Sequence, residues 1–307
     1  MRTDFHQRSG VPDGQFDDSR WDSAEEAAAK IFRGLSKSTP NLYSGLSGRL
    51  IRSLDQRLPE ALSGLQKGRV PAAKNPIRHV VVTGGANGIG EAIVHTYAAA
   101  GEAEITLIDR DKARGESLAR ALTERGKTAH FLAADLTDAA AHPPLARQLT
   151  DHPPIDLLVL NAGINRATPF FDGDVATDRA MIALNFLSPI RLVHELLAAG
   201  RLAEGGTVVL ISSLSKFVSY PGAAVYGASK DGLHAFAQSL REILKPHHIR
   251  VLIVYPGPTE TDQARRNSPG DPAKSQRMPP AVLAQKIHRA VERRRRWLIP
   301  GLGNRII

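Results

Sequence analysis

The chain has 307 residues, 42% of them hydrophobic and 23% charged, which excludes global disorder and suits a soluble globular protein with a full core. It contains no cysteine, which excludes disulfides, thiolate metal sites and cysteine nucleophiles. The formal net charge of +9 equals that of residues 263–307 alone, which hold 11 Lys and Arg against 2 Asp and Glu, so the basic character belongs to one end of the chain.

Residues 1–76 predict an N-terminal extension. Residues 1–20 are polar without an apolar period and predict disorder. Ser23 and Glu26 have capping-box spacing and predict a helix to about Leu35, and leucines four residues apart predict a second, amphipathic helix (Leu42, Leu46, Leu50, Leu54 and Leu58). We expect these helices to pack on their own domain or on a second subunit; a membrane surface is the alternative that we do not favour.

No signal peptide begins the chain, and no run of 18 apolar residues occurs in it. We therefore expect a cytoplasmic protein.

Residues 77–307 alternate short β-branched runs with longer helical patterns, which is typical of βαβ units. The fold class predicted is α/β, a Rossmann-type doubly wound parallel sheet with helices on both faces. The predicted strands span residues 79–83, 104–109, 128–133, 155–161, 206–212 and 250–255.

The first strand runs into a glycine-rich turn that opens a helix. Such a turn lets the backbone approach a pyrophosphate at the positive end of the helix dipole. Its residues predicted to bind a dinucleotide are Thr83, Gly84, Asn87, Gly88, Ile89 and Gly90.

Asp109 follows Gly90 by 19 residues and ends the second strand. An acidic residue at this place hydrogen-bonds the adenosine ribose hydroxyls and repels the 2′-phosphate of NADP. Asp109 therefore favours NAD, with NADP as the alternative, and the adjacent Arg110 is positioned to stack on adenine or to reach a phosphate.

A candidate catalytic set lies near the fifth strand. Ser213 follows that strand, Tyr226 comes 13 residues later and Lys230 four residues after Tyr226. On a helix this spacing puts the phenol and the ammonium on one face, where the cation favours the phenolate. An unperturbed tyrosine has a pKa of about 10 and would otherwise be a poor base near neutrality.

With these motifs in chain order, residues from about Arg78 to Pro300 resemble a short-chain dehydrogenase/reductase of the classical type. Further matching positions follow the third, fourth and sixth strands or lie in a helix: Asp135, Leu136, Asn161, Ala162, Gly163, Asn185, Pro256, Gly257, Thr259 and Thr261. The N-terminal extension has no counterpart in the minimal domain of the family.

The resemblance implies a role for each position. Tyr226 would be the general acid/base, Ser213 would hold the substrate oxygen, and Lys230 would bind the nicotinamide ribose and lower the pKa of Tyr226. Asn185 would anchor a water that passes the proton to bulk. The cofactor would also meet Asp135 and Leu136 at the adenine, Asn161–Gly163 at the adenosine ribose, and Pro256–Thr261 at the carboxamide and pyrophosphate.

The residues expected to flank the substrate favour a hydrophobic secondary alcohol or ketone: Ser213, Leu214, Phe217, Val218, Tyr220 and Tyr226, with Phe170 and Phe171. Residues 263–280 stand where the family carries a mobile loop over the substrate. Four basic residues there would meet a CoA or carrier phosphopantetheine, or are simply solvated: Arg265, Arg266, Lys274 and Arg277.

The final elements predicted are a helix from Pro280 that ends in Arg293–Arg296 and an edge strand at residues 297–300. The predicted function is hydride transfer between NAD(P) and a secondary alcohol or ketone, in a homodimer or homotetramer, with no metal and no nucleic-acid partner. The alternative function is a non-catalytic Rossmann protein that senses a dinucleotide or binds a partner.

Overall fold

The structure, a computed structural model, describes residues 76–166, 170–216, 221–267 and 277–300. Several predicted features lie outside the described residues: the helices predicted within residues 1–76, the basic residue Lys274, and the substrate-flanking residues Phe217, Val218 and Tyr220.

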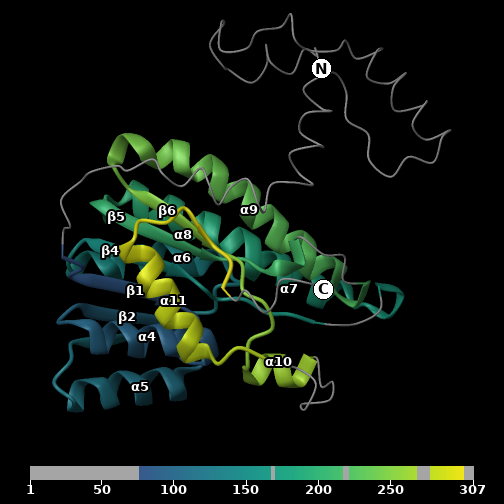
Figure 1. Ribbon diagram of the computed structural model, residues 1–307, viewed down its shortest axis with the longest axis horizontal. Helices are drawn as coiled ribbons and strands as arrows, with labels where there is room; N and C mark the ends of the chain where they lie inside the picture. The colour runs from purple at the N-terminus through teal and green to yellow at the C-terminus, as the bar shows by residue number, and fades with distance from the viewer. Residues whose placement is uncertain (1–75, 167–169, 217–220, 268–276, 301–307) are drawn as a thin grey trace, which may run out of the picture. The chain divides into compact units, whose positions relative to one another are not determined.

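The described residues form a seven-stranded parallel sheet in the order β3-β2-β1-β4-β5-β6-β7 (Figure 1). The strands are β1 (His79–Thr83), β2 (Glu104–Asp109), β3 (Ala129–Ala133), β4 (Ile155–Leu160), β5 (Leu202–Ile211), β6 (Arg250–Val254) and β7 (Trp297–Leu298). The strand order reverses between β1 and β4, which is where ligands bind in doubly wound folds. The predicted fold class is confirmed.

Helices cover both faces of this sheet (Figure 1). One face packs against α4 (Gly88–Ala100), α5 (Lys112–Glu124) and α11 (Pro280–Glu292). The other packs against α6 (His142–Gln148), α8 (Ser188–Ala198) and α9 (Ala224–Leu244). The central strands are mostly apolar along their length because both of their faces are buried: all six residues of β4 are buried.

Shorter elements complete the carboxyl edge of the sheet. They are the 3₁₀ turns η5 (Phe170–Asp172), η7 (Leu214–Lys216) and η8 (Pro221–Ala223), and the helices α7 (Val175–Ile182) and α10 (Asp262–Asn267).

Several predicted boundaries differ from the structure by one or two residues, and two differ by more. β5 begins at Leu202 rather than at Gly206, because Leu202 pairs with Ile155 before a register shift in the β4–β5 ladder. The last helix ends at Glu292 rather than in the arginine run: Arg293 is its C-cap, and Arg294 has φ 55°, which ends the helical path.

Among the described residues, one continuous helical segment, Val175–Ala198, is long and apolar enough to cross a membrane by length and composition. Three of its side chains, Leu192, Val193 and Leu196, are buried in the core beneath the sheet. A helix buried in a protein core can have the same length and apolar composition, and this segment packs in the way that a core helix does.

Candidate active site

Tyr226 and Lys230 lie one turn apart near the start of α9, as their spacing predicts. The Lys230 ammonium nitrogen is 5.9 Å from the centre of the Tyr226 ring. Lys230 is 4% exposed, whereas Tyr226 is partly buried. The cation is therefore held beside the phenol, away from bulk water.

Burial lowers the pKa of Lys230 to about 8. The ammonium is fixed by a hydrogen bond of 2.9 Å that it donates to the carbonyl oxygen of Ile211 at the end of β5. Because an ammonium donates a stronger hydrogen bond than a neutral amine does, this contact favours the charged form and holds it at the end of β5.

Ser213 comes two residues after the end of β5 and meets Tyr226 there. Burial raises the pKa of Tyr226, and the hydrogen bond between the two side chains opposes that shift. The adjacent Ser212 donates to the carbonyl of Lys230 at 3.0 Å and joins β5 to α9. The predicted serine, tyrosine and lysine thus meet at one point.

Asn185 lies in a π-helical turn, Ala183–Leu187, between α7 and α8, and it is fully buried. Its side chain accepts from Ile164 N at 2.8 Å, donates to Ile164 O at 2.9 Å and donates to Ser229 Oγ at 3.1 Å. Asn185 therefore links the segment after β4 to α9. A Cβ added at Gly163 would lie 3.1 Å from Asn185 Oδ1 and 3.3 Å from Lys230 Nζ, so Asn185 and Lys230 converge there.

The glycine turn at the end of β1 fits a dinucleotide pyrophosphate. Gly84 has φ +63°, and a Cβ there would lie 2.9 Å from the Ala162 backbone. A Cβ at Gly90 would lie 1.9 Å from Gly84 O. Asn87, the N-cap of α4, makes no side-chain capping bond, so the first N–H groups of the helix are not capped by it.

Thr83 and Asn161 brace this turn. The Thr83 hydroxyl accepts from the N–H groups of Asn161 at 3.0 Å and Ala162 at 3.1 Å. The Asn161 amide donates to the carbonyls of Thr83 and Gly84, both at 3.1 Å. The two residues that sequence reasoning assigned to cofactor contact therefore hold the turn in shape with their side chains.

Asp109 lies beside the glycine turn, as predicted. Its carboxylate accepts from Ala86 N at 3.1 Å and from Asp111 N at 3.0 Å. Arg110 and Asp135 are exposed nearby, and hydrogen bonds from Thr137 lower the pKa of Asp135. Leu136 is 4% exposed and packs in the core, and its contact with an adenine stays a prediction.

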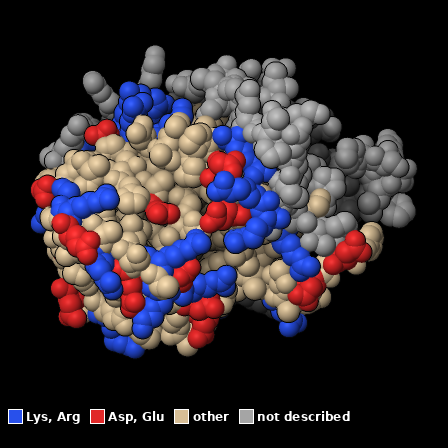
Figure 2. Space-filling model, turned by 90° about the horizontal axis from the view of Figure 1, so that it is seen from below, with Lys and Arg blue, Asp and Glu red and all other residues tan. Residues whose placement is uncertain are grey.

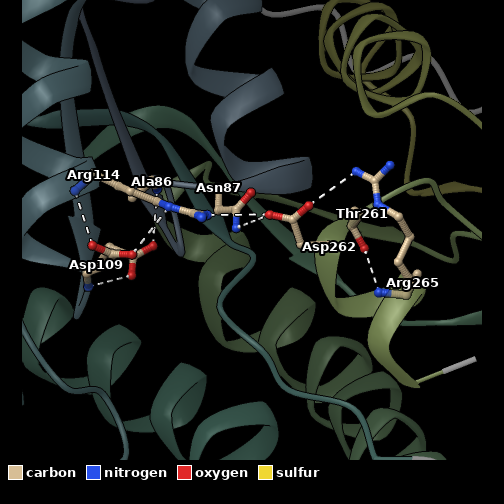
Figure 3. Close-up of polar contacts among 9 residues, drawn as sticks. Ala86, Asn87, Asp109, Arg114, Thr261, Asp262 and Arg265 are labelled. Atoms are coloured by element: carbon tan, nitrogen blue, oxygen red, sulfur yellow. Dashed lines mark hydrogen bonds and ion pairs between the residues drawn. The ribbon is translucent and has the colours of Figure 1, made fainter.

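The segment after β6 reaches back to the glycine turn (Figure 3). Asn87 Nδ2 donates to Asp262 Oδ2 at 3.3 Å, and Arg114 of α5 lies 3.5 Å from the same carboxylate oxygen. Thr261 faces Gly88, where an added Cβ would lie 3.2 Å from its methyl group. This network, which the sequence did not predict, fastens α10 to the turn.

Two arginines of the predicted basic loop are paired with acidic side chains. Arg265 lies 3.1 Å from Glu260 and 3.2 Å from Asp262, and Arg277 lies 3.9 Å from Glu260. On the face shown in Figure 2, basic and acidic side chains are interspersed. Because both arginines pair with acidic side chains of this chain, the pairing favours a role in ion pairs over the binding of a carrier.

Of the predicted substrate-flanking residues, Leu214 lies in η7 after Ser213 and is partly buried. Phe171 is 97% exposed. A cavity of about 540 Å³ lies between α4, α10 and the start of α11, and none of Ser213, Tyr226 and Lys230 lines it. That cavity is distinct from the catalytic set.

Residues 78–271 match the family of short chain dehydrogenases. The chain belongs to the classical short-chain dehydrogenase/reductase family. The predicted membership is confirmed, and with it an oxidoreductase that depends on NAD(P).

Named relatives of this family agree with the match. Dehydrogenase/reductase SDR family member 7B of Xenopus laevis is 31% identical over 239 residues, covering 73% of this chain and 74% of that protein. A short-chain dehydrogenase from Sphingobium yanoikuyae in complex with NADPH is 28% identical, with a TM-score of 0.66 over 74% of this chain and 89% of that one. The bulky-bulky ketone specific alcohol dehydrogenase from Comamonas testosteroni is 27% identical, with a TM-score of 0.64 over 74% and 87%.

Proposed function

We propose that this short-chain dehydrogenase/reductase interconverts a hydrophobic secondary alcohol and its ketone with NAD or NADP. The observation that carries the proposal is the meeting of Ser213, Tyr226 and Lys230 after β5, where the Ser213 side chain is near enough to Tyr226 to lower its pKa and Lys230 is buried 5.9 Å from the tyrosine ring. The non-catalytic alternative is not favoured, because a dinucleotide sensor has no need of a buried lysine beside a phenol.

The bound nicotinamide would supply the chemistry of hydride transfer. Ser213 holds the substrate oxygen by a hydrogen bond, and Tyr226 takes the alcohol proton or returns it to the ketone oxygen. Lys230 in its charged form favours the phenolate of Tyr226 and so opposes the rise in the Tyr226 pKa that burial causes. Asn185 fixes Ile164 and α9, which hold these groups in place. We also propose that Lys230 passes the proton toward bulk solvent.

The pyrophosphate would lie against the glycine turn, and the adenosine ribose at Asp109. We propose that the protein prefers NAD over NADP, since a 2′-phosphate would stand beside the Asp109 carboxylate. The Sphingobium yanoikuyae relative was solved with NADPH, so both cofactors belong in the test.

Replacing Asp109 by Asn is expected to raise the ratio of kcat/KM for NADP to that for NAD by about tenfold, because it removes one like charge at a partly wet site. The side chain keeps an acceptor for Ala86 N or Asp111 N. Asp111→Asn is the matched control, a nearby carboxylate that lies 3.6 Å from Arg114. Steady-state kinetics with both cofactors measure the ratio. An equal change in both variants would contradict a specific role for Asp109.

A panel of secondary alcohols and ketones, with free and CoA-linked members, tests the proposed reaction with NAD(H) and NADP(H) side by side. We expect turnover of at least one hydrophobic member, followed by the absorbance of the reduced nicotinamide. Tight cofactor binding without turnover of any member would contradict the proposal and support the dinucleotide-sensing alternative. A homodimer or homotetramer and a cytoplasmic location stay predictions.

A further inference from the structure

At the amino ends of the strands, opposite the catalytic edge, three potential metal ligands come together. Among the described residues, Glu104, His130 and His152 each offer a ligand atom, and these atoms lie within 4.8 Å of one another. Glu104 is the first residue of β2, His130 belongs to β3, and His152 precedes β4. Their positions in the chain are 26 and 22 residues apart, so no local motif announces the cluster.

The sheet register explains why these side chains meet. In the β2–β3 ladder Thr106 pairs with His130, and Glu104 lies two residues before Thr106, so Glu104 and His130 are diagonal neighbours on one face. His152 follows the turn η4 (Leu149–Asp151), which packs on that same face. Each ligand therefore comes from a separate but fixed element.

The distances suit a single ion. His152 Nδ1 is 2.6 Å from Glu104 Oε1, and His130 Nε2 is 3.6 Å from the same oxygen. Ligand atoms around a tetrahedral ion with bonds of about 2.0–2.1 Å lie about 3.3 Å apart. Because the three ligand atoms lie within 4.8 Å of one another, changes of up to about 1.5 Å in their separations would complete the coordination. Glu104 and His152 are 17% and 16% exposed, whereas His130 is 42% exposed, which leaves one side open to a water ligand.

The surroundings hold His152 in this position. His79 packs its ring 5.7 Å from that of His152, and both His79 nitrogens are engaged, with Pro153 O at 2.8 Å and Thr106 Oγ1 at 2.9 Å. The guanidinium of Arg201 donates to the backbone carbonyl of His152. His79 thus packs behind His152 and helps to hold its ring in place.

We propose that Glu104, His130 and His152 form a binding site for a divalent transition-metal ion, Zn²⁺ above all. Two imidazoles and one carboxylate suit Zn²⁺, Co²⁺ or Ni²⁺, whereas Mg²⁺ and Ca²⁺ prefer oxygen ligands. The ion would join β2, β3 and the segment before β4 at the end of the sheet that faces away from the Tyr226 site. Its role is structural, because it lies apart from the hydride-transfer residues.

Co²⁺ is the direct probe, since its visible absorption reports nitrogen and oxygen coordination. The full chain without an affinity tag is first treated with a chelator and then titrated with Co²⁺, with Zn²⁺ and with Mg²⁺. We expect one equivalent of Co²⁺ to bind and Zn²⁺ to displace it. A hundredfold excess of Zn²⁺ over its Kd is expected to raise Tm by about 5–10 °C.

His130→Gln and His152→Gln are each expected to weaken Co²⁺ binding by at least about tenfold. The matched control is His194→Gln, an exposed histidine whose Nδ1 lies 3.8 Å from a carboxylate oxygen of Glu195. The His194→Gln variant should bind Co²⁺ as the wild type does, because His194 lies beside a carboxylate but outside the cluster. His130 is half-exposed, so its variant should fold even if that of His152 does not. Absence of Co²⁺ binding, equal binding of Mg²⁺, or binding that survives both substitutions would overturn the proposal.

Discussion

Tyr226→Phe is expected to lower kcat by about 10²–10⁴-fold while changing the Kd of NAD(H) by no more than about threefold. The substitution removes the hydroxyl that exchanges a proton with the substrate oxygen, and general acid/base catalysis contributes that much. The ring that packs near Lys230 is kept, so the cofactor site should stay intact. Steady-state kinetics and a fluorescence titration with reduced cofactor measure the two quantities.

Tyr97→Phe is the matched control. Tyr97 is 3% exposed in α4, and its hydroxyl has no hydrogen-bond partner among the described residues. Removing that hydroxyl should leave kcat unchanged and the protein at least as stable, because a buried hydroxyl without a partner is unfavourable. If Tyr226→Phe retained wild-type turnover, the acid/base role of Tyr226 would be refuted.

Lys230→Met is expected to abolish most activity and yet stabilise the fold at pH 7. Burial moves the pKa of Lys230 from 10.5 to about 8, which corresponds to a cost of about 3 kcal/mol for holding the charge in the folded state. Loss of the hydrogen bond to Ile211 O offsets about 1 kcal/mol of the gain. Urea unfolding should therefore show an increase of about 2 kcal/mol in the free energy of unfolding.

The pH dependence of this effect follows from the lowered pKa. Below pH 8 both the folded and the unfolded chain carry the proton, and the burial cost is fully present. Between about pH 8 and 10.5 the unfolded chain binds a proton that the folded chain does not, so the stability of the wild type rises with pH relative to the variant. The advantage of Lys230→Met should therefore shrink from pH 7 to pH 9.5.

Lys245→Met serves as the control for the lysine substitution. Its side chain is 78% exposed shortly after α9. The activity should therefore stay at the wild-type level, and the free energy of unfolding should change by no more than about 0.5 kcal/mol. A Lys230→Met variant that is less stable than the wild type at pH 7 would contradict the account of a costly buried charge.

The sheet was largely predictable because a strand covered on both faces must be apolar along its whole length. β1 and β2 begin and end at the predicted residues, and the turn after β1 follows from its glycines. β5 begins earlier than predicted because Gly205 and Gly206 look like a turn in sequence, whereas the chain is already paired with β4 at Leu202. Pairing between distant strands decides such a boundary, and the local pattern does not contain it.

The candidate site, too, combines features that the local sequence predicts with features that depend on distant contacts. The spacing of Tyr226 and Lys230 on one helix face is a local property, and it was predictable. That Asn185 sits in a π-helical turn, that Asp262 joins Asn87 to Arg114, and that Leu136 is buried depend on contacts between segments far apart in the chain. The cluster of Glu104, His130 and His152 likewise exists only once β2, β3 and the segment before β4 are in register.

Isotope transfer tests the central claim most directly. Secondary alcohols of the panel, deuterated at the carbinol carbon, are incubated with oxidised cofactor and the protein, and the cofactor is analysed by mass spectrometry. We predict that deuterium from at least one alcohol appears in the reduced nicotinamide with the wild type, and that with Tyr226→Phe its rate of appearance falls by about 10²–10⁴-fold. A reduced cofactor without deuterium, or equal transfer by the two proteins, would contradict hydride transfer at the Ser213, Tyr226 and Lys230 site.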